Sequence, residues 1–340
     1  MHNGVVRCTR LGVLRCQGQD AAAFLHNMLT QDVLHRDANH ACLAGWCSPQ
    51  GRLLASVVLL RGTQVAVPNA TPNATPGTTQ NPVHDATQEA VFLVVAQDLV
   101  ATTLQGLRKF VLRSRVILED CSLHRPVWGL VGSAVAACAP QHAADDAAPW
   151  MRWRINGADV VRLPDAAGVA RALWIGDSPA TQPPAPASPD NEVNEPNALD
   201  EETWEWLAVH SGIAWITART SNLFVPQMLG YDALGAIDFR KGCYPGQEVI
   251  ARSQYRGKVQ RRACLARCAV ALHAGQEICA DPETPCGTVV QAAASPGGDG
   301  GYDAIICIHA DAPARIFATT TEGKPIALTL SPPFPAASSP

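Results

Sequence analysis

The chain has 340 residues, of which 47% are hydrophobic and 16% are charged, and its formal net charge at pH 7 is −4. The charged share is below the roughly 25% of an average soluble protein, and these values exclude a collagen-like, coiled-coil, highly charged disordered or strongly basic chain. The length exceeds that of one ordinary domain, so two or three packed units are expected.

The chain ends and the cysteines indicate a cytoplasmic protein without a membrane partner. The first ten residues lack the apolar stretch and cleavage site of a secretory signal, and no apolar run reaches the roughly 18 residues of a transmembrane helix. Thiols stay reduced in the cytoplasm, so the twelve cysteines are expected as buried apolar residues rather than disulfides. No Cys-x-x-Cys pair or other spacing typical of a zinc site occurs.

Apolar patterns predict a mixed helix and strand region over residues 1–256. Helices are expected at 21–30, 98–110 and 200–211, the first two with Asp20 and Asp98 as N-caps. Strands are expected at 11–16, 41–47, 52–60, 91–96, 111–118, 150–155, 159–163 and 172–175. Two helices interleaved with strands are typical of an α+β sandwich of the split βαβ kind, in two interleaved subdomains.

Proline-rich segments interrupt this region, and the pattern changes beyond it. Residues 67–88 and 178–196 are interpreted as inserted loops. After residue 257, short strands separated by Gly/Pro turns predict a small antiparallel barrel over 257–330, followed by a disordered tail over 331–340. These strands are expected at 260–270, 275–280, 287–292, 304–308 and 314–320.

The segment 240–262 is the most basic part of this acidic chain. It holds one Glu, Glu248, and seven basic residues: Arg240, Lys241, Arg252, Arg256, Lys258, Arg261 and Arg262. Such a cluster favours an anionic partner, which can be a carboxylate-bearing cofactor, phosphate or RNA. A solvated helix face is the alternative.

One turn inside this segment carries the candidate reactive residue. The run is Lys241-Gly242-Cys243-Tyr244-Pro245-Gly246-Gln247-Glu248. Its glycines and proline predict a turn followed by a helix at 249–254. Cys243 would then lie near a helix N-terminus and several cations, which lower the pKa of a thiol and favour its thiolate. On this ground alone, a reactive and an inert Cys243 both stay open.

This run, followed by VIAR and YRG, resembles the signature of the YgfZ family, the folate-binding relatives of the glycine-cleavage T-protein (aminomethyltransferase). Other blocks agree in the same order, at 18–21, 30–33, 50–52, 107–116, 222–227 and 235–239. The resemblance spans about residues 10–265.

The resemblance implies ferredoxin-like α+β domains around a central folate cleft, with a C-terminal antiparallel β-barrel. It implies tetrahydrofolate or a derivative as the ligand, and a role in the assembly or repair of iron–sulfur proteins, including tRNA-modifying enzymes. Trp204, eight residues before Gly212, matches a folate-site aromatic residue; an indole can stack on a pterin, and a core position is the alternative. His210 and Arg252 complete the expected folate site, and Arg240, Arg256 and Lys258 the anion-binding residues.

Two departures argue against aminomethyl transfer. His210 stands where the T-protein has a glutamate, and residues 51–60 contain no acid where the T-protein carries aspartates. Apolar side chains cannot supply the missing carboxylate, so an accessory protein is favoured over an enzyme. One loop offers too few thiolates for a cluster, so no stably bound metal is expected. The alternatives are a folate-dependent one-carbon transferase or demethylase, and weak tRNA binding through the basic segment.

Overall fold

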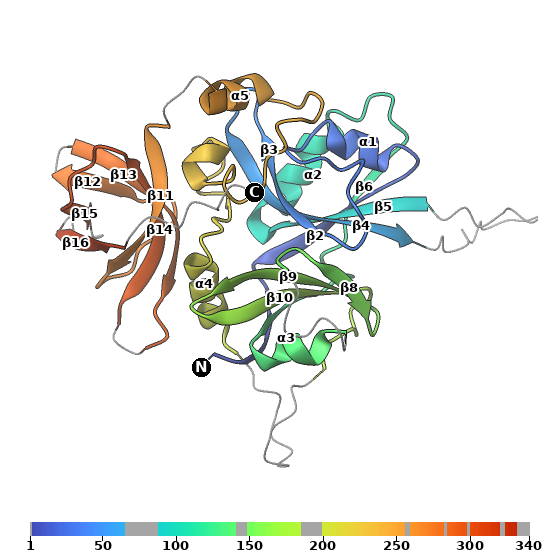
Figure 1. Ribbon diagram of the computed structural model, residues 1–340, viewed down its shortest axis with the longest axis horizontal. Coiled ribbons are helices and arrows are strands. Elements are labelled where there is room, and N and C mark those ends of the chain that lie inside the picture. The colour runs from blue at the N-terminus through green and yellow to red at the C-terminus, as the bar shows by residue number, and fades with distance from the viewer. Residues whose placement is uncertain are drawn as a thin grey trace, which may run out of the picture.

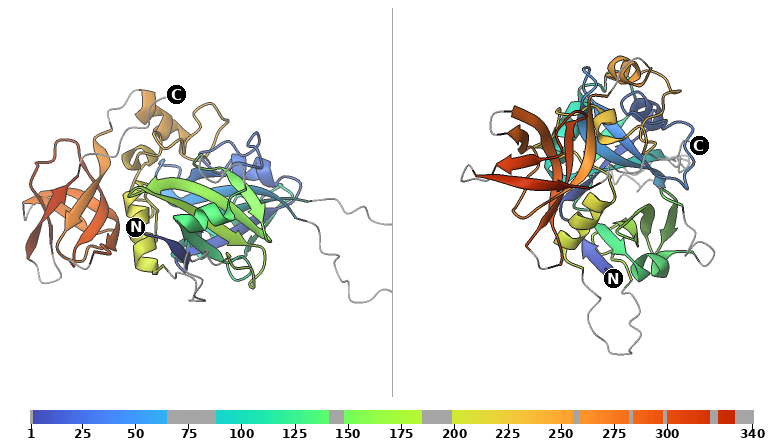
Figure 2. Two further views of the ribbon diagram at one scale, coloured as in Figure 1. Left: turned by 60° about the horizontal axis from the view of Figure 1, so that its bottom comes forward. Right: turned by 60° about the vertical axis from the view of Figure 1, so that its left-hand side comes forward.

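The computed structural model describes residues 2–64, 88–140, 148–184, 199–255, 259–281, 284–297, 300–319 and 324–331. Their strands form two five-stranded antiparallel sheets and one closed barrel (Figure 1). The barrel lies at one end of the molecule, and the two sheets lie together at the other, as the further views in Figure 2 also show. The predicted fold class, an α+β body with a C-terminal antiparallel barrel, is confirmed.

The first sheet is a βαββαβ unit with one extra edge strand. Its order is β3-β4-β5-β2-β6, with α1 after β2 and α2 after β5. Residues 90–96 are all buried, which explains their continuous apolar sequence. The elements are β2 (Leu11–Gln17), α1 (Ala21–His26), β3 (Cys42–Cys47), β4 (Leu53–Gln64), β5 (Gln88–Ala96), η1 (Gln97–Leu99), α2 (Val100–Arg108) and β6 (Ile117–Asp120).

The second sheet has the same arrangement, but one of its edge strands, β1, comes from the N-terminal end of the chain. Its order is β1-β7-β10-β9-β8, so β1 takes the edge position beside β7 that β6 takes beside β2 in the first sheet. The chain therefore starts in the second sheet and then builds the first. The elements are β1 (Gly4–Arg7), β7 (Val127–Val131), α3 (Ser133–Cys138), β8 (Arg152–Ile155), β9 (Ala158–Ala166), β10 (Val169–Gly176) and α4 (Glu201–His210).

The barrel closes through pairing of its first and last strands. The order is β11-β14-β13-β12-β15-β16, and Ala266 of β11 pairs with Leu330 of β16. The expected boundary at residue 257 lies outside the described residues, between α5 and β11. The elements are η2 (Pro226–Leu229), α5 (Gln247–Tyr255), β11 (Arg261–Cys268), β12 (Glu277–Asp281), β13 (Thr284–Ala294), β14 (Tyr302–His309), β15 (Ile316–Thr319) and β16 (Pro325–Leu330).

The segment after α4 packs onto the first sheet and so carries the motif region to it. Ser56 of β4 makes the contact: its hydroxyl lies 2.6 Å from the Tyr231 hydroxyl and accepts a hydrogen bond from the Ile216 backbone at 2.8 Å. Ser56 and Tyr231 are fully buried. No helix among the described residues is long and apolar enough to span a membrane.

Several sequence-based boundaries are wrong. The helix expected at 21–30 ends at His26, because Thr30 already bonds to Gly45 of β3 through its backbone N–H at 2.9 Å. Asp20 precedes that helix without capping it; its carboxylate accepts from the Arg115 backbone instead. The strand expected at 111–118 begins only at Ile117. Strands β1, β7 and β16 and helix α3 were not expected. The predicted loops and tail lie mostly outside the described residues.

Candidate functional site

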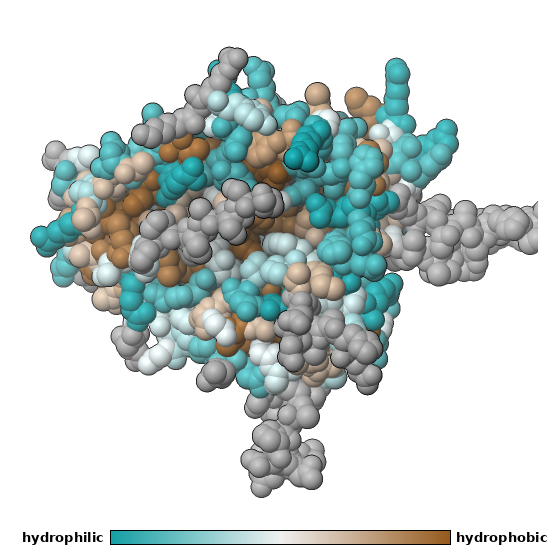
Figure 3. Space-filling view, viewed as in Figure 1, coloured by the Kyte–Doolittle hydropathy of each residue, from teal (hydrophilic) through white to brown (hydrophobic). Residues whose placement is uncertain are grey.

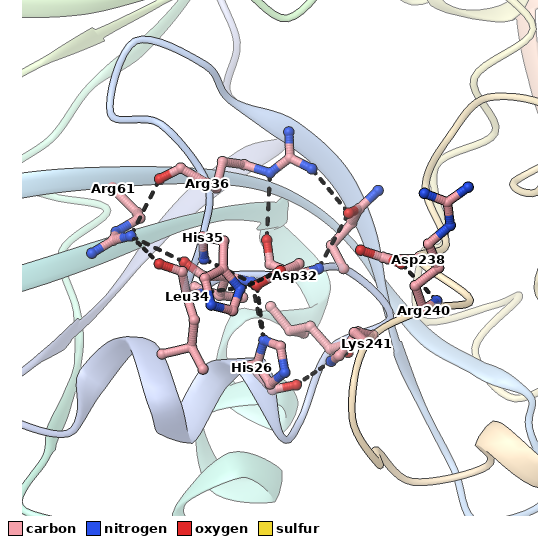
Figure 4. Close-up of polar contacts among 12 residues, drawn as sticks. His26, Asp32, Leu34, His35, Arg36, Arg61, Asp238, Arg240 and Lys241 are labelled. Atoms are coloured by element: carbon pink, nitrogen blue, oxygen red, sulfur yellow. Dashed lines mark hydrogen bonds and ion pairs between the residues drawn. The ribbon is translucent and has the colours of Figure 1, made fainter. Parts of the chain in front are cut away.

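The motif loop, residues 241–248, is fixed to the C-terminal end of α1 by Lys241. This side chain is buried, and its Nζ donates hydrogen bonds to the carbonyl oxygens of His26 and, at 2.6 Å, Leu29 (Figure 4). The ammonium lies 4.8 Å from the centre of the Tyr244 ring. Burial lowers the pKa of Lys241 to about 8. A cation suits this place because carbonyls at a helix C-terminus carry partial negative charge.

Gly246 packs the same loop directly against a second turn, residues 48–52. Its φ is +82°, and an added Cβ would lie 2.4 Å from the Ser48 carbonyl oxygen and 2.6 Å from the Gly51 Cα. Gly51 has a φ of +71°, and a Cβ there would lie 3.0 Å from the Cβ of Val249. Only glycine combines this left-handed conformation with so close an approach. The Gln-Gly-Arg block and the cysteine motif thus meet in space.

Cys243 is the one exposed cysteine of the chain. The other eleven are buried, and all twelve are unpaired. Burial raises the pKa of Cys16 and of Cys47 to about 12, which keeps these thiols protonated. Gln247, the first residue of α5, donates from Nε2 to the Lys241 carbonyl oxygen at 3.5 Å and so closes the loop around the thiol. An exposed thiol on a fixed turn is open to a partner.

The cations expected around Cys243 make contacts with other residues or are exposed. Arg240 is exposed, and its backbone N–H donates to Asp238 at 2.8 Å. Arg252 is exposed on α5 with a guanidinium nitrogen 3.6 Å from a Glu248 carboxylate oxygen. Two further candidates, Arg256 and Lys258, lie outside the described residues. Anion binding by these residues therefore stays a prediction.

A cavity of about 260 Å³ lies where α4, both sheets and the barrel meet. Three residues of α4 line it, Trp204, Glu205 and Ala208, and Arg171 of β10 lines it from the second sheet. No residue of the motif loop, 241–248, is among the described lining residues. In Figure 1, α4 lies well below α5, and Figure 2 shows the same separation. The thiol and this cavity are thus two separate features.

Trp204 and Arg171 form the inner wall of this cavity. Trp204 is 3% exposed, and an added Cβ on Gly129 would lie 2.5 Å from its ring. The Arg171 guanidinium is centred 4.6 Å from the indole, and its Nη1 donates to the Leu207 carbonyl oxygen at 3.0 Å. Its Nε is buried and has no hydrogen-bond partner in the described part of the chain. Burial lowers the pKa of Arg171 to about 10, so the side chain is still charged at neutral pH.

Glu205 is the carboxylate of this cavity among the described lining residues. Burial raises its pKa. A wider cavity of about 880 Å³ adjoins the first and shares Arg219, His273 and Ala274 with its lining. The smaller cavity thus offers the Trp204 ring, the unpaired Nε of Arg171 and the Glu205 carboxyl group. The wider cavity continues it along residues of the barrel.

His210 lies on the opposite side of α4 and faces the barrel. Its Nε2 lies 2.9 Å from a carboxylate oxygen of Asp303 in β14, and the Trp206 indole donates to the same oxygen at 2.6 Å. Residues two apart on a helix point about 200° from each other, so the side of Trp206 and His210 is not the side of Trp204 and Ala208. His210 is not among the described residues that line the cavity.

Comparison with known proteins shows what this chain is similar to. No family model matches the chain. The chain is 25% identical over 328 residues to the tRNA-modifying protein YgfZ of Edwardsiella ictaluri, across 94% of this chain and 88% of that protein. It is 28% identical over 262 residues to the tRNA-modifying protein YgfZ of Hamiltonella defensa, across 72% of this chain and 64% of that protein. The chain is therefore similar to YgfZ proteins over most of its length.

The fold of this chain also resembles that of a solved structure. The glycine cleavage system aminomethyltransferase T of Bartonella henselae superposes with a TM-score of 0.63, across 97% of this chain and 85% of that one. The two sequences are 14% identical, so this likeness concerns the fold. This chain and the T-protein thus share a fold, as the sequence resemblance implied.

The structure brings only part of the expected folate site together. Trp204 lines the central cavity, whereas His210 faces Asp303 and Arg252 is exposed on α5. Strand β4 carries no acidic residue. No group of three or more His, Cys, Asp and Glu side chains in the described ranges is arranged to hold a metal ion.

Two cavity residues, Arg171 and Glu205, were not found from the sequence. Arg171 interrupts the apolar run of β10, and an arginine in a buried strand signals a special role. Glu205 directly follows Trp204 in α4, and helix periodicity turns it about 100° away from Trp204, so the helix pattern gave no reason to place it at the cavity. Arg171 and Glu205 line one cavity only because β10 packs against α4, and no local sequence pattern predicts that contact.

Proposed function

We propose that this protein is a tetrahydrofolate-binding accessory protein that supports assembly or repair of iron–sulfur clusters, including those of tRNA-modifying enzymes. Cys243 is its key thiol in this proposal. The observation that carries the proposal is the cavity at Trp204, with the unpaired Nε of Arg171 buried beside the indole.

The side chains around this cavity fit a reduced folate. An indole can stack on a pterin or aminobenzoyl ring. Carbonyl and carboxylate oxygens of the ligand can accept from the Arg171 guanidinium, and the pterin N–H groups can donate to Glu205. The volume of about 260 Å³ is slightly below the roughly 300–1,000 Å³ of whole-ligand sites, so it fits the ring head, and the adjoining cavity takes the remainder. Bound tetrahydrofolate supplies a carrier of one-carbon units.

Cys243 supplies the second part of the proposed function. Its exposed sulfur can provide one ligand to a cluster, or exchange with a partner's disulfide, while the other cluster ligands come from the client protein. Iron–sulfur proteins or their assembly machinery are therefore the proposed partners, and the cluster is cargo. The proposal places the protein in the cytoplasm, where twelve unpaired cysteines stay reduced.

A second candidate function is a folate-dependent one-carbon transferase or demethylase. Glu205 favours it, because a buried carboxyl group with a raised pKa in a ligand cavity can act as a general acid or base. Conversion of methylene- or formyl-tetrahydrofolate, measured by chromatography, distinguishes the two candidates. Turnover by the wild type supports the enzyme, and binding without turnover supports the accessory protein.

Titration with tetrahydrofolate, followed by tryptophan fluorescence, tests the site. We expect saturable quenching in the wild type and strongly weakened binding in Trp204→Ala and Glu205→Gln. Trp206→Phe is the matched control, because Trp206 lies on the other side of α4. Far-UV circular dichroism establishes that each variant is folded. Unchanged affinity in both Trp204→Ala and Glu205→Gln would show that folate does not bind in this cavity.

A further inference from the structure

A residue of the barrel, Gln291 in β13, lines the same cavity as Trp204 and Glu205. Gln291 is 7% exposed, and its neighbours in the strand are Val290 and Ala292. Hydrophobic residues also gather over the barrel end of the molecule in Figure 3. A buried amide in such apolar surroundings is costly unless its polar atoms have hydrogen-bond partners. The contacts of Gln291 therefore indicate what this amide is placed to do.

A β-bulge turns Gln291 toward the cavity. The register between β13 and β14 shifts by one residue, because Val289 pairs with Ile306 and Gln291 pairs with Ile305. Val289 packs in the core of the barrel, and regular strand alternation would send Gln291 into that same core. The extra residue, Val290, packs in the core of the sheet region instead, and Gln291 lines the cavity. A bulge of this kind re-aims a side chain.

One hydrogen bond fixes which end of the Gln291 amide is the donor. Its Oε1 accepts from the Trp215 backbone N–H at 3.1 Å. A backbone N–H only donates, so the other end of the amide is Nε2, which carries two hydrogens. Gln291 also forms a side-chain hydrogen bond with Glu205, in which the amide donates and the carboxylate accepts. Nε2 keeps a second hydrogen and the carboxylate keeps further acceptor positions, so both groups can still bind a ligand.

Glu205 and Gln291 thus present an acceptor and a donor side by side to the cavity. Such a pair complements a lactam edge, in which a ring N–H lies next to a ring carbonyl group. A pteridine with a 4-oxo group has this edge at N3–H and C4=O. In a 4-amino pteridine the order is reversed, because N3 has no hydrogen and C4 carries an NH₂ donor.

On the basis of the proposed function, we propose that Gln291 is a specificity-determining residue that makes this cavity select 4-oxo over 4-amino pteridines. The Glu205 carboxylate accepts from N3–H, and Gln291 Nε2 donates to the C4 carbonyl oxygen. With a 4-amino pteridine, the Gln291 donor meets another donor, and both N–H groups stay unpaired in a buried place. Sites built around a hydrogen bond reject ligands that cannot make it.

Titrations of the full-length protein with tetrahydrofolate and with tetrahydroaminopterin, its 4-amino analogue, test this selection. Both titrations are followed by tryptophan fluorescence in the absence of oxygen. We expect the wild type to bind tetrahydrofolate at least about tenfold more tightly, as for one buried hydrogen bond left unmade. A wild type that binds the 4-amino compound equally well or more tightly contradicts the proposal.

The exchange variant Glu205→Gln/Gln291→Glu gives the decisive comparison. It keeps the net charge and still pairs an amide with a carboxylate, but it exchanges the donor and the acceptor. We expect the ratio of the two dissociation constants to shift about tenfold or more toward the 4-amino compound. Gln291→Met, which replaces the amide at similar volume, should shift the ratio in the same direction. It is decisive alone if thermal melting shows that the exchange variant is misfolded.

Gln260→Glu is the matched control, because Gln260 is exposed near the start of the barrel. It should keep the wild-type ratio. An unchanged ratio in the folded exchange and Gln291→Met variants, or an equal shift in Gln260→Glu, overturns the role of Gln291 and leaves folate binding intact. A wild type that binds neither compound refutes the proposed function, and the role of Gln291 with it.

Discussion

Gly246→Ala tests whether the cysteine motif depends on close packing against the Gly51 turn. Two costs add. Alanine at a φ of +82° costs about 1–2 kcal/mol because its Cβ crowds the following carbonyl. The new Cβ would also lie 2.4 Å from the Ser48 oxygen and 2.6 Å from the Gly51 Cα, which are backbone atoms that cannot rotate away. Relieving such overpacking costs roughly 1–3 kcal/mol.

The expected loss for Gly246→Ala is therefore about 2–5 kcal/mol, a large part of the roughly 5–15 kcal/mol that stabilises an ordinary domain. Gly230→Ala is the matched control, because Gly230 has a φ of +73° and nothing within 4 Å of the added Cβ. Urea unfolding of both variants measures the difference. If Gly246→Ala is no less stable than Gly230→Ala, the loop is not held by this contact.

Two further substitutions test polar contacts near the site. Burial alone would raise the pKa of Asp32, but hydrogen bonds from His35 outweigh it and lower this pKa from the usual 3.8 to about 2. The ionised Asp32 carboxylate therefore stabilises the fold above pH 3.8, and this contribution is lost as the pH falls through 2. Asp32→Asn removes this carboxylate. Between about pH 5 and pH 2, the difference in free energy of unfolding between the wild type and the variant should therefore shrink by about 2 kcal/mol, as measured by urea unfolding. A difference that stays constant over this pH range contradicts the role given to Asp32. Trp206→Phe deletes the 2.6 Å hydrogen bond to buried Asp303 and should cost about 1.5–3 kcal/mol in urea unfolding, whereas a loss under about 0.5 kcal/mol argues against that bond.

Local patterns predicted the elements that have a clear apolar run or a strong capping residue. Strand β5 and the helix at 200–211 follow from their side chains, and Asp200 caps that helix by accepting from the Thr203 backbone at 2.5 Å. Strand β1 was missed because four residues carry too little periodicity, and its only reason to be a strand is its pairing with β7. Short edge strands depend on distant partners.

The candidate site was likewise predicted only in part from the sequence. The motif identified Cys243 as the residue of interest, and the structure finds it exposed while eleven other cysteines are buried. The direction of Lys241 could not be predicted, because its hydrogen-bond acceptors, His26 at the end of α1 and Leu29 just after it, lie more than 200 residues earlier in the chain. Sequence reasoning treated it as a cation beside the thiol, whereas it is buried against the end of that helix.

Complementation most directly tests the claim that this protein acts through Cys243 in iron–sulfur maintenance. Cells lacking the protein receive the wild type, Cys243→Ser or the buried-cysteine control Cys279→Ser, and the product of an iron–sulfur tRNA-modifying enzyme is measured in bulk tRNA. We predict that the wild type and Cys279→Ser restore the modified nucleoside and that Cys243→Ser, expressed at the same level, does not. Full restoration by Cys243→Ser would contradict the account.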